Sequence, residues 1–224
     1  NTISGLLSLA LAHEYGEPIK ALIVVPTISV KQWHAETERW CPGFKTTSIP
    51  SKVPKKDRLQ TYASKWDILI MGNHSFTRDV EHIDKIGIKQ IIVDDIDPAL
   101  NVGNATFRAL DVICSKADIV IDMNATSLHL LQLYAASCLI GGRNVWGSKT
   151  NVEKSFVRKE KVNIRVKGGG LKRIYQAVGY KNLELLRRKF NPMSIRITYE
   201  DIADDVTIPS LVTEQVYLDM SPKQ

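Results

Sequence analysis

Three acidic side chains stand within four residues, directly after a short apolar segment. The segment 91–93 (Ile-Ile-Val) has the composition of a buried strand, and Asp94, Asp95 and Asp97 follow it. Open α/β sheets bind their ligands outside the carboxyl ends of the strands, so carboxylates at this place can hold a metal ion or act on a phosphate group. The alternative interpretation is that the three acids cap a helix or face solvent.

The elements that would position these acids alternate along the first 140 residues. Apolar runs predict strands at 21–25, 68–71, 91–93 and 119–121. Amphipathic or apolar patterns predict helices at 3–15, 29–40, 57–64, 77–85, 105–115 and 127–139, and residues 48–56 are expected to form a loop. Such alternation is typical of a parallel sheet that is covered by helices on both faces.

The positive charge is concentrated in residues 143–198. This segment has 15 Lys or Arg and three Glu, a net charge of +12, whereas the rest of the chain has 15 basic and 21 acidic residues, a net charge of −6. Strand-like runs at 161–166 and 173–178 flank three glycines and predict a hairpin, followed by a helix at 183–190. Because aromatic residues are interleaved with the charges, we favour contact with nucleic acid over a merely solvated face.

The remaining composition excludes several classes of protein. No apolar run approaches the roughly 18 residues that a membrane span needs. The chain begins without Met or a secretory signal, which suggests a fragment. Cys41, Cys114 and Cys138 form no CxxC pair and are expected to be reduced thiols, and the five His show no metal-ligand spacing. We therefore expect an intracellular protein of the cytoplasm or nucleus that is neither secreted nor in a membrane.

A series of short motifs, in order, resembles one known family. The segments are LIVVPTISVKQW (22–33), WCPG (40–43), DILIMGNHSF (67–76), DDIDPALN (94–101), FRAL (107–110), RITYED (196–201) and YLDMSPKQ (217–224). In this order and spacing they resemble the first RecA-like lobe of the Swi/Snf-like superfamily-two helicases, the chromatin-remodeller type. The resemblance implies an α/β fold with a RecA-like parallel sheet over residues 1–142, a basic extension over 143–215 and the start of an interlobe linker over 216–224.

The resemblance also implies a function. Members of this family are ATP-driven translocases on double-stranded DNA, with ATP and Mg²⁺ bound between this lobe and a second RecA-like lobe of the same protein. Asp94 and Asp95 match the catalytic acids, Thr2 and Asp94 match the magnesium ligands, and Asp97 joins them in nucleotide binding. Contacts to the DNA backbone are expected at the ends of strands and starts of helices and in the basic extension, at Thr27, Lys31, His74, Ser75, Arg78, Arg158, Lys159, Lys161, Lys167, Lys172 and Arg173.

Several positions depart from the family pattern. Only Asn1-Thr2 remains of the P-loop GKT, and Thr2 is equally well explained as a helix N-cap. Asp95 is one methylene shorter than the family's Glu, Asp97 replaces a His, and residues 122–125 (Asp-Met-Asn-Ala) replace TGTP.

Two hypotheses therefore stay open. The chain is the first lobe of a working ATPase, or it is a catalytically degenerate lobe that acts as a DNA-binding or regulatory platform. In either case it should turn over ATP poorly without a second lobe. A third hypothesis, an unrelated small-molecule enzyme, would need a glycine-rich loop after the first strand, where the chain has Pro26-Thr27.

Trp33 is expected to pack in the core.

Overall fold

The computed structural model describes residues 2–96, 102–123, 129–165, 171–198 and 201. Residues 1–193 and 194–224 form two compact units, and the elements below all belong to the first.

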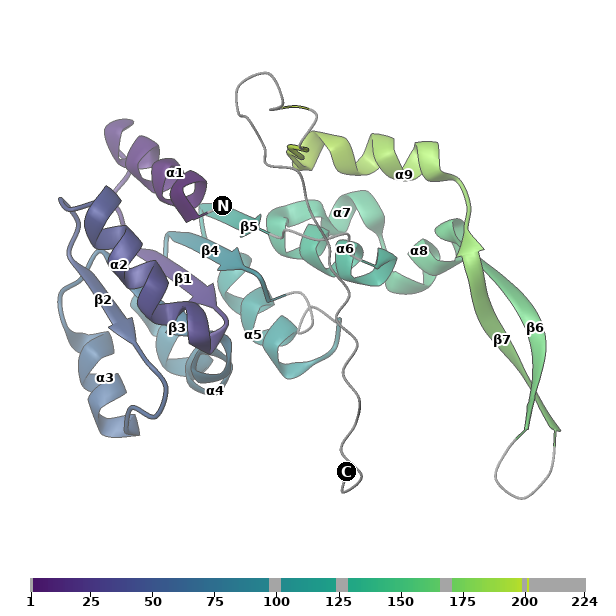
Figure 1. The fold of residues 1–224 in the computed structure, drawn as a ribbon, viewed down its shortest axis with the longest axis horizontal. Helices are drawn as coiled ribbons and strands as arrows, with labels where there is room; N and C mark the ends of the chain where they lie inside the picture. The colour runs from purple at the N-terminus through teal and green to yellow at the C-terminus, as the bar shows by residue number, and fades with distance from the viewer. Residues whose placement is uncertain (1, 97–101, 124–128, 166–170, 199–200, 202–224) are drawn as a thin grey trace, which may run out of the picture. The chain divides into compact units, whose positions relative to one another are not determined.

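Five parallel strands form the central sheet, in the order β2-β3-β1-β4-β5 (Figure 1). The strands are β1 (Ala21–Val25), β2 (Thr46–Ile49), β3 (Ile68–Gly72), β4 (Gln90–Asp94) and β5 (Ile119–Met123). Every residue of β1 and β3 is buried, as is typical of strands covered on both faces. The predicted RecA-like parallel sheet is therefore confirmed. Because all five strands are parallel, their carboxyl ends lie at one edge of the sheet.

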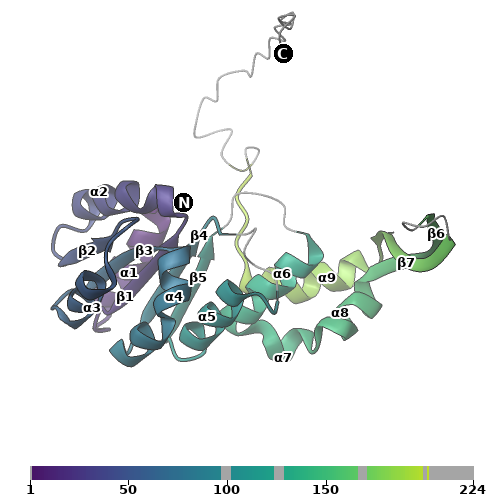
Figure 2. The same cartoon turned by 90° about the horizontal axis from the view of Figure 1, so that it is seen from below.

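Helices cover both faces of this sheet. Side chains alternate along β1, so that Ile23 joins a core cluster with helices α1 (Thr2–Glu14) and α2 (Val30–Trp40). Leu22 and Val24 join the opposite cluster, with α3 (Lys55–Ala63), α4 (Asn73–Ile83) and α5 (Ala105–Cys114). Figure 2 shows α2 on one side of the sheet and α4 and α5 on the other. Short 3₁₀ turns, η1 (Thr27–Ser29) and η2 (Asp84–Ile86), precede α2 and follow α4.

Beyond the sheet, the chain continues as short helices and a hairpin. They are α6 (Leu130–Ser137), the π-helical segment η4 (Cys138–Gly142), α7 (Arg143–Trp146), α8 (Lys149–Phe156), strands β6 (Val157–Arg165) and β7 (Leu171–Tyr180), α9 (Leu183–Phe190) and the turn η5 (Asn191–Met193). Trp146, Val152 and Phe156 belong to the same core cluster as the α4 and α5 face of the sheet. The predicted hairpin is confirmed, with antiparallel pairing from Val157↔Tyr180 to Arg165↔Leu171.

Some boundaries differ from the predictions. Residues 46–49 form strand β2, although 48–56 was expected to be a loop and 57 to begin the next helix, which starts at Lys55. Polar Thr46 to Ser48 show no apolar alternation, and only their pairing with β3 makes them a strand. Helix α4 begins at Asn73 rather than 77, and α6 begins at Leu130. Helices α7 and α8 were not predicted.

The cysteines agree with the expectation of reduced thiols, since all three are buried and none forms a disulfide within the described residues. Among the described residues, no helix is both long and apolar enough to span a membrane.

Candidate functional site at the carboxyl edge of the sheet

Asp94 is the last residue of β4 and pairs in register with Met123 of β5. The indole nitrogen Nε1 of Trp33 donates a hydrogen bond to Asp94 Oδ2 over 3.0 Å. Partial burial raises the pKa of Asp94, and the neighbouring charge of Asp95 raises it further, against the opposing effect of the Trp33 hydrogen bond. The carboxylate is thus held at the sheet edge by one oxygen.

The chain turns sharply directly after Asp94. Asp95 has a left-handed backbone (φ 55°), and its amide donates to the carbonyl of Met123 over 3.0 Å. Left-handed backbone costs a non-glycine residue roughly 1–2 kcal/mol, although Asp tolerates it better than most. Such strain often occurs where a side chain must be aimed for function. Asp97 lies outside the described residues.

The start of α1 lies at this same edge. A Cβ built on Gly5 would approach Met123 Cε to 3.1 Å and Ile92 Cδ1 to 3.4 Å, so the first turn of α1 packs on the last residue of β5 and the middle of β4 (Figure 1). Thr2 begins that turn. A helix start presents free amide groups and a partial positive charge, which favour phosphate groups. The first turn of α1, which Thr2 begins, thus packs beside the carboxyl end of β5, the neighbour of β4.

The donor set at this edge fits a magnesium–nucleotide complex. Mg²⁺ prefers oxygen ligands and is usually held by one or two protein groups together with substrate phosphates and water. The Asp94 carboxylate and the Thr2 hydroxyl are such oxygen donors. Among the described residues, no group of three or more His, Cys, Asp or Glu forms an all-protein metal cage.

A second group of predicted residues lies where β1 and β3 end. These strands are neighbours, with Val25 paired to Gly72. A Cβ on Gly72 would lie only 2.6 Å from Thr27 Oγ1, so η1 and the start of α4 are in close contact. Exposed Lys31 lies in the first turn of α2, next to η1.

The first two turns of α4 supply the other members of this group. His74 and Arg78 are exposed and Ser75 is half-buried. Arg78 Nη2 donates a hydrogen bond to Ser75 Oγ over 3.5 Å. We call Thr27, Lys31, His74, Ser75 and Arg78 the rim residues; they occupy the starts of two adjacent helical segments, where phosphate groups bind well.

A buried polar network joins α3 to α4 beneath the rim. Arg58 Nη2 donates to Asp79 Oδ1 over 2.9 Å, and the Tyr62 hydroxyl donates to Asp79 Oδ2 over 2.9 Å. Arg58 Nη1 also donates to the carbonyl of Val53 over 2.6 Å. Although burial raises the pKa of Asp79, the hydrogen bonds from Arg58 and Tyr62 lower it more, and the carboxylate stays charged.

The predictions from sequence missed both this network and the Trp33–Asp94 hydrogen bond. One signal was present for the network: Asp79 stands on the apolar stripe of α4 between Phe76 and Ile83, where a lone carboxylate needs a buried partner. Trp33 is buried at 2% exposure, as predicted, but nothing in its spacing indicated which group its indole nitrogen would find.

The basic residues of the hairpin fall into separate groups. Pairing of Lys161 with Tyr175, Lys159 with Ala177 and Asn163 with Arg173 places these side chains on one face. Arg158 instead lies over Gly179, at the irregularity in the ladder. Lys167 and the side chain of Lys172 lie outside the described part of the structure.

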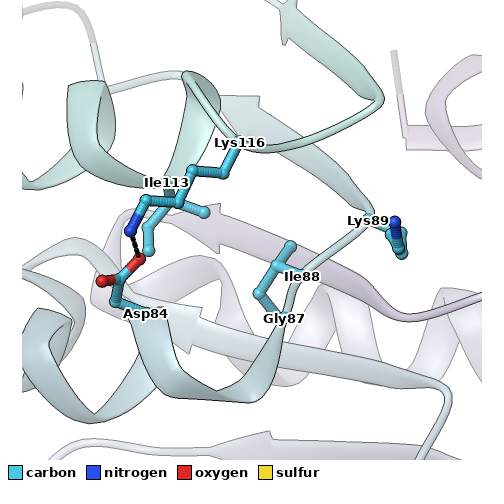
Figure 3. Close-up of a pocket in the computed structure, with 6 residues that line it drawn as sticks. All are labelled: Asp84, Gly87, Ile88, Lys89, Ile113 and Lys116. Atoms are coloured by element: carbon cyan, nitrogen blue, oxygen red, sulfur yellow. Dashed lines mark hydrogen bonds and ion pairs between the residues drawn. The ribbon is translucent and has the colours of Figure 1, made fainter.

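A small hollow at the opposite end of β4 does not belong to this site (Figure 3). It measures about 100 Å³ and is lined by Gly87, Ile88 and Lys89, which precede β4, and by the ion pair of Lys116 with Asp84. Asp94 lies at the other end of the same strand.

Comparison with known proteins identifies the family. The model of the SNF2-related domain matches residues 1–224. The chain is 23% identical over 137 residues to Helicase swr1 of Aspergillus fumigatus, covering 60% of this chain and 8% of that protein. It is 22% identical over 223 residues to an ATP-dependent helicase of Mycoplasma pneumoniae, covering 98% of this chain and 19% of that one. The chain thus spans a small part of the length of these relatives.

The fold is similar to a solved structure of the same family. The Sulfolobus solfataricus SWI2/SNF2 ATPase core in complex with double-stranded DNA aligns with a TM-score of 0.68 at 18% identity, covering 91% of this chain and 39% of that one. The family match over residues 1–224, the order of strands in the sheet and the acidic end of β4 all point to the same family. The chain belongs to the SNF2-related domain family and has the fold of the first RecA-like lobe of a Swi/Snf-like ATPase core.

Proposed function

We propose that this chain is the first lobe of a DNA-dependent ATPase that translocates on double-stranded DNA. The observation that carries the proposal is the contact of the first turn of α1 with Met123, the residue of β5 that pairs with Asp94. In this proposal residues 1–142 are the RecA-like lobe, 143–215 are a basic extension and 216–224 begin the linker to a second lobe.

ATP–Mg²⁺ would bind at the edge of β4. Thr2 and Asp94 would hold the metal ion, which neutralises charge on the phosphate groups when bound. Asp95 would orient the attacking water, and Asp97 would contribute to nucleotide binding. A cation from the second lobe would stabilise the charge of the transition state. Trp33 would keep Asp94 in one orientation through its hydrogen bond.

Double-stranded DNA would bind along the rim residues. Their hydroxyl, imidazole and basic groups lie at helix starts, which suits phosphate groups rather than base edges. The Sulfolobus relative was solved with double-stranded DNA, which supports this choice of partner. Arg158, Lys159, Lys161, Lys167, Lys172 and Arg173 would add contacts from the basic extension.

The second candidate is a degenerate lobe that binds DNA without ATP turnover. It is favoured by the side chain of Asp95, which is one methylene shorter than the Glu of the family pattern. A misplacement of about 1 Å at a reacting group can lower the rate about a hundredfold.

ATP hydrolysis by the protein at its full natural length separates the two candidates. Turnover would be measured with and without double-stranded DNA, in the wild type and in Asp94→Ala. The matched control is Asp118→Ala, at the amino end of β5 and away from the site. Stimulated turnover that only Asp94→Ala abolishes supports the motor. Absent turnover with intact DNA binding supports the platform.

A further inference from the structure

A hollow with a strongly basic lining lies where α8 meets the hairpin. It measures about 390 Å³, within the range of sites that bind small molecules. We call it the α8 hollow; its polar lining residues are Thr150, Glu153, Lys154, Lys159, Tyr175 and Lys181.

Backbone and side-chain hydrogen bonds fix the walls of the α8 hollow. The amide of Lys181 donates to the carbonyl of Phe156 over 2.9 Å, and Asn182 Nδ2 donates to the carbonyl of Ser155 over 2.7 Å. Both bonds tie the end of β7 to α8. Phe156 is itself part of the core, so the lysines project from an anchored frame.

The charge in the α8 hollow is only partly compensated. Lys159 Nζ lies 2.6 Å from Glu153 Oε2, and this hydrogen bond lowers the pKa of the Glu153 carboxyl. Within the described residues, Lys154 and Lys181 have no ion-pair partner. Three ammonium groups therefore face one carboxylate, and an anion would complete the balance.

An exposed aromatic ring stands beside these charges. Tyr175 is 66% exposed on β7, and the ammonium of its cross-strand neighbour Lys161 lies 5.6 Å from the ring centre. Sites for unpaired nucleic acid combine lysines along the phosphate backbone with aromatic rings on which bases stack. Paired bases in a duplex do not offer their flat faces to such a ring.

We propose that the α8 hollow binds one unpaired nucleotide of a nucleic-acid strand. Its phosphate lies among Lys154, Lys159 and Lys181, and its base stacks on Tyr175. This inference rests on the proposed function for nucleic acid as the partner, and it adds a contact that is separate from the rim residues and selective for unpaired strand.

Removing the competing carboxylate gives the sharpest test. Glu153→Gln frees Lys159, so affinity for a single-stranded oligonucleotide should rise by about threefold to tenfold, given the strength of exposed ion pairs and phosphate contacts. Glu160→Gln is the matched control, because this substitution also removes one negative charge but on the other face of the hairpin. Fluorescence anisotropy with the full-length protein measures both. Equal effects of the two substitutions would show a general charge effect and overturn the proposal.

Substitutions of the ring and of the lysines test the two proposed contacts, with the base and with the phosphate. Tyr175→Thr keeps a residue that favours strands, and it should weaken single-strand binding about tenfold, whereas Tyr175→Phe should not. The double substitution of Lys154→Ala and Lys181→Ala should weaken single-strand binding by a similar factor. Blunt duplex binding should change less in each case; equal loss for both probes would overturn the assignment to an unpaired nucleotide.

The rim residues distinguish this inference from the proposed function. If Lys31→Ala and Arg78→Ala weaken duplex binding while no substitution in the α8 hollow changes single-strand binding, only this inference fails. If the wild type binds neither probe, both fail.

Discussion

At the scale of single residues, the contact between Trp33 and Asp94 links two motifs far apart in the sequence. The hydrogen bond joins the helix that carries the rim residue Lys31 to the carboxylate proposed to hold magnesium. A hydrogen bond to a charged group contributes about 1.5–3 kcal/mol and also sets its direction. Trp33 is therefore a positioning residue for Asp94.

Trp33→Phe should separate packing from positioning. The ring stays in the core while the N–H that orients Asp94 is lost, so ATP turnover should fall by about tenfold or more with DNA affinity unchanged. Steady-state ATPase assays and DNA titration measure the two quantities. Trp40→Phe is the control, because Trp40 lies on the same helix at 47% exposure and donates to Glu36 instead. Turnover unaffected by Trp33→Phe would exclude the positioning role.

At the scale of elements, the rim depends on how α3, α4 and η1 are held together. The buried pair of Arg58 with Asp79 connects two helices, and close contact at Gly72 connects two loops. Arg58 and Asp79 are buried, whereas the contact at Gly72 includes the rim residue Thr27. Both control the places from which His74, Ser75 and Arg78 project.

Asp79→Asn should loosen α3 and α4. It leaves the Arg58 guanidinium buried without a counter-charge, which typically costs about 3–5 kcal/mol. Hydrogen exchange of the α3 and α4 amides in the full-length protein should show the lost protection. Asp84→Asn is the control, because its pair with Lys116 is partly exposed, with side chains 29% and 59% accessible, and should contribute under about 1 kcal/mol.

The same pair predicts a dependence on pH. The folded state lowers the pKa of Asp79, so the charged pair contributes its full stability above the ordinary Asp pKa of about 3.9. This contribution is lost as the pH falls through the lower folded pKa. The difference in protection between wild type and Asp79→Asn should therefore shrink below about pH 4. A difference that is constant with pH would contradict the ionic assignment.

Gly72→Ala should disturb the rim directly. The added Cβ would meet Thr27 Oγ1 at 2.6 Å and Thr27 Cα at 3.1 Å, and overpacking of this kind costs about 1–3 kcal/mol. We expect a lower melting temperature and weaker duplex binding. Gly43→Ala is the control, since a Cβ there meets nothing within 4 Å. Unchanged DNA affinity in Gly72→Ala would show that the spacing of η1 and α4 does not matter for binding.

At the scale of the whole molecule, charge is divided along the chain. Residues 143–198 carry a net charge of +12 in a protein of net charge +6. A protein that neutralises phosphates with Lys and Arg releases counterions, so its affinity falls with salt and varies little with sequence.

Salt titrations of duplex binding should therefore be steep. The slope of log affinity against log salt should become shallower by roughly one for each phosphate contact removed, for example in Lys31→Ala or Arg78→Ala. Lys55→Ala, an exposed lysine on α3, should leave the slope unchanged. Binding that does not depend on salt would contradict the backbone-contact model.

The sequence by itself determined the local elements and the family. Apolar runs such as 21–25 and 91–93 specify buried strands, because their side chains must leave water on both faces. The acids at the end of β4 and the motif order predicted a phosphate-type site at the carboxyl edge, which stays a prediction, and paired strand-like runs around three glycines predicted the hairpin, which the structure confirms.

Tertiary structure decided the contacts that join distant segments. The order of the strands and the membership of polar β2 in the sheet depend on pairing along a neighbouring strand. The hydrogen-bond partners of Trp33 and Asp79 lie 61 and 17 positions away in the sequence. The α8 hollow likewise forms only when the hairpin register sets Tyr175 beside lysines of α8, of β6 and of the segment that follows β7. Periodicity and composition describe which face a side chain takes, whereas its partner is set by packing between elements that local sequence does not encode.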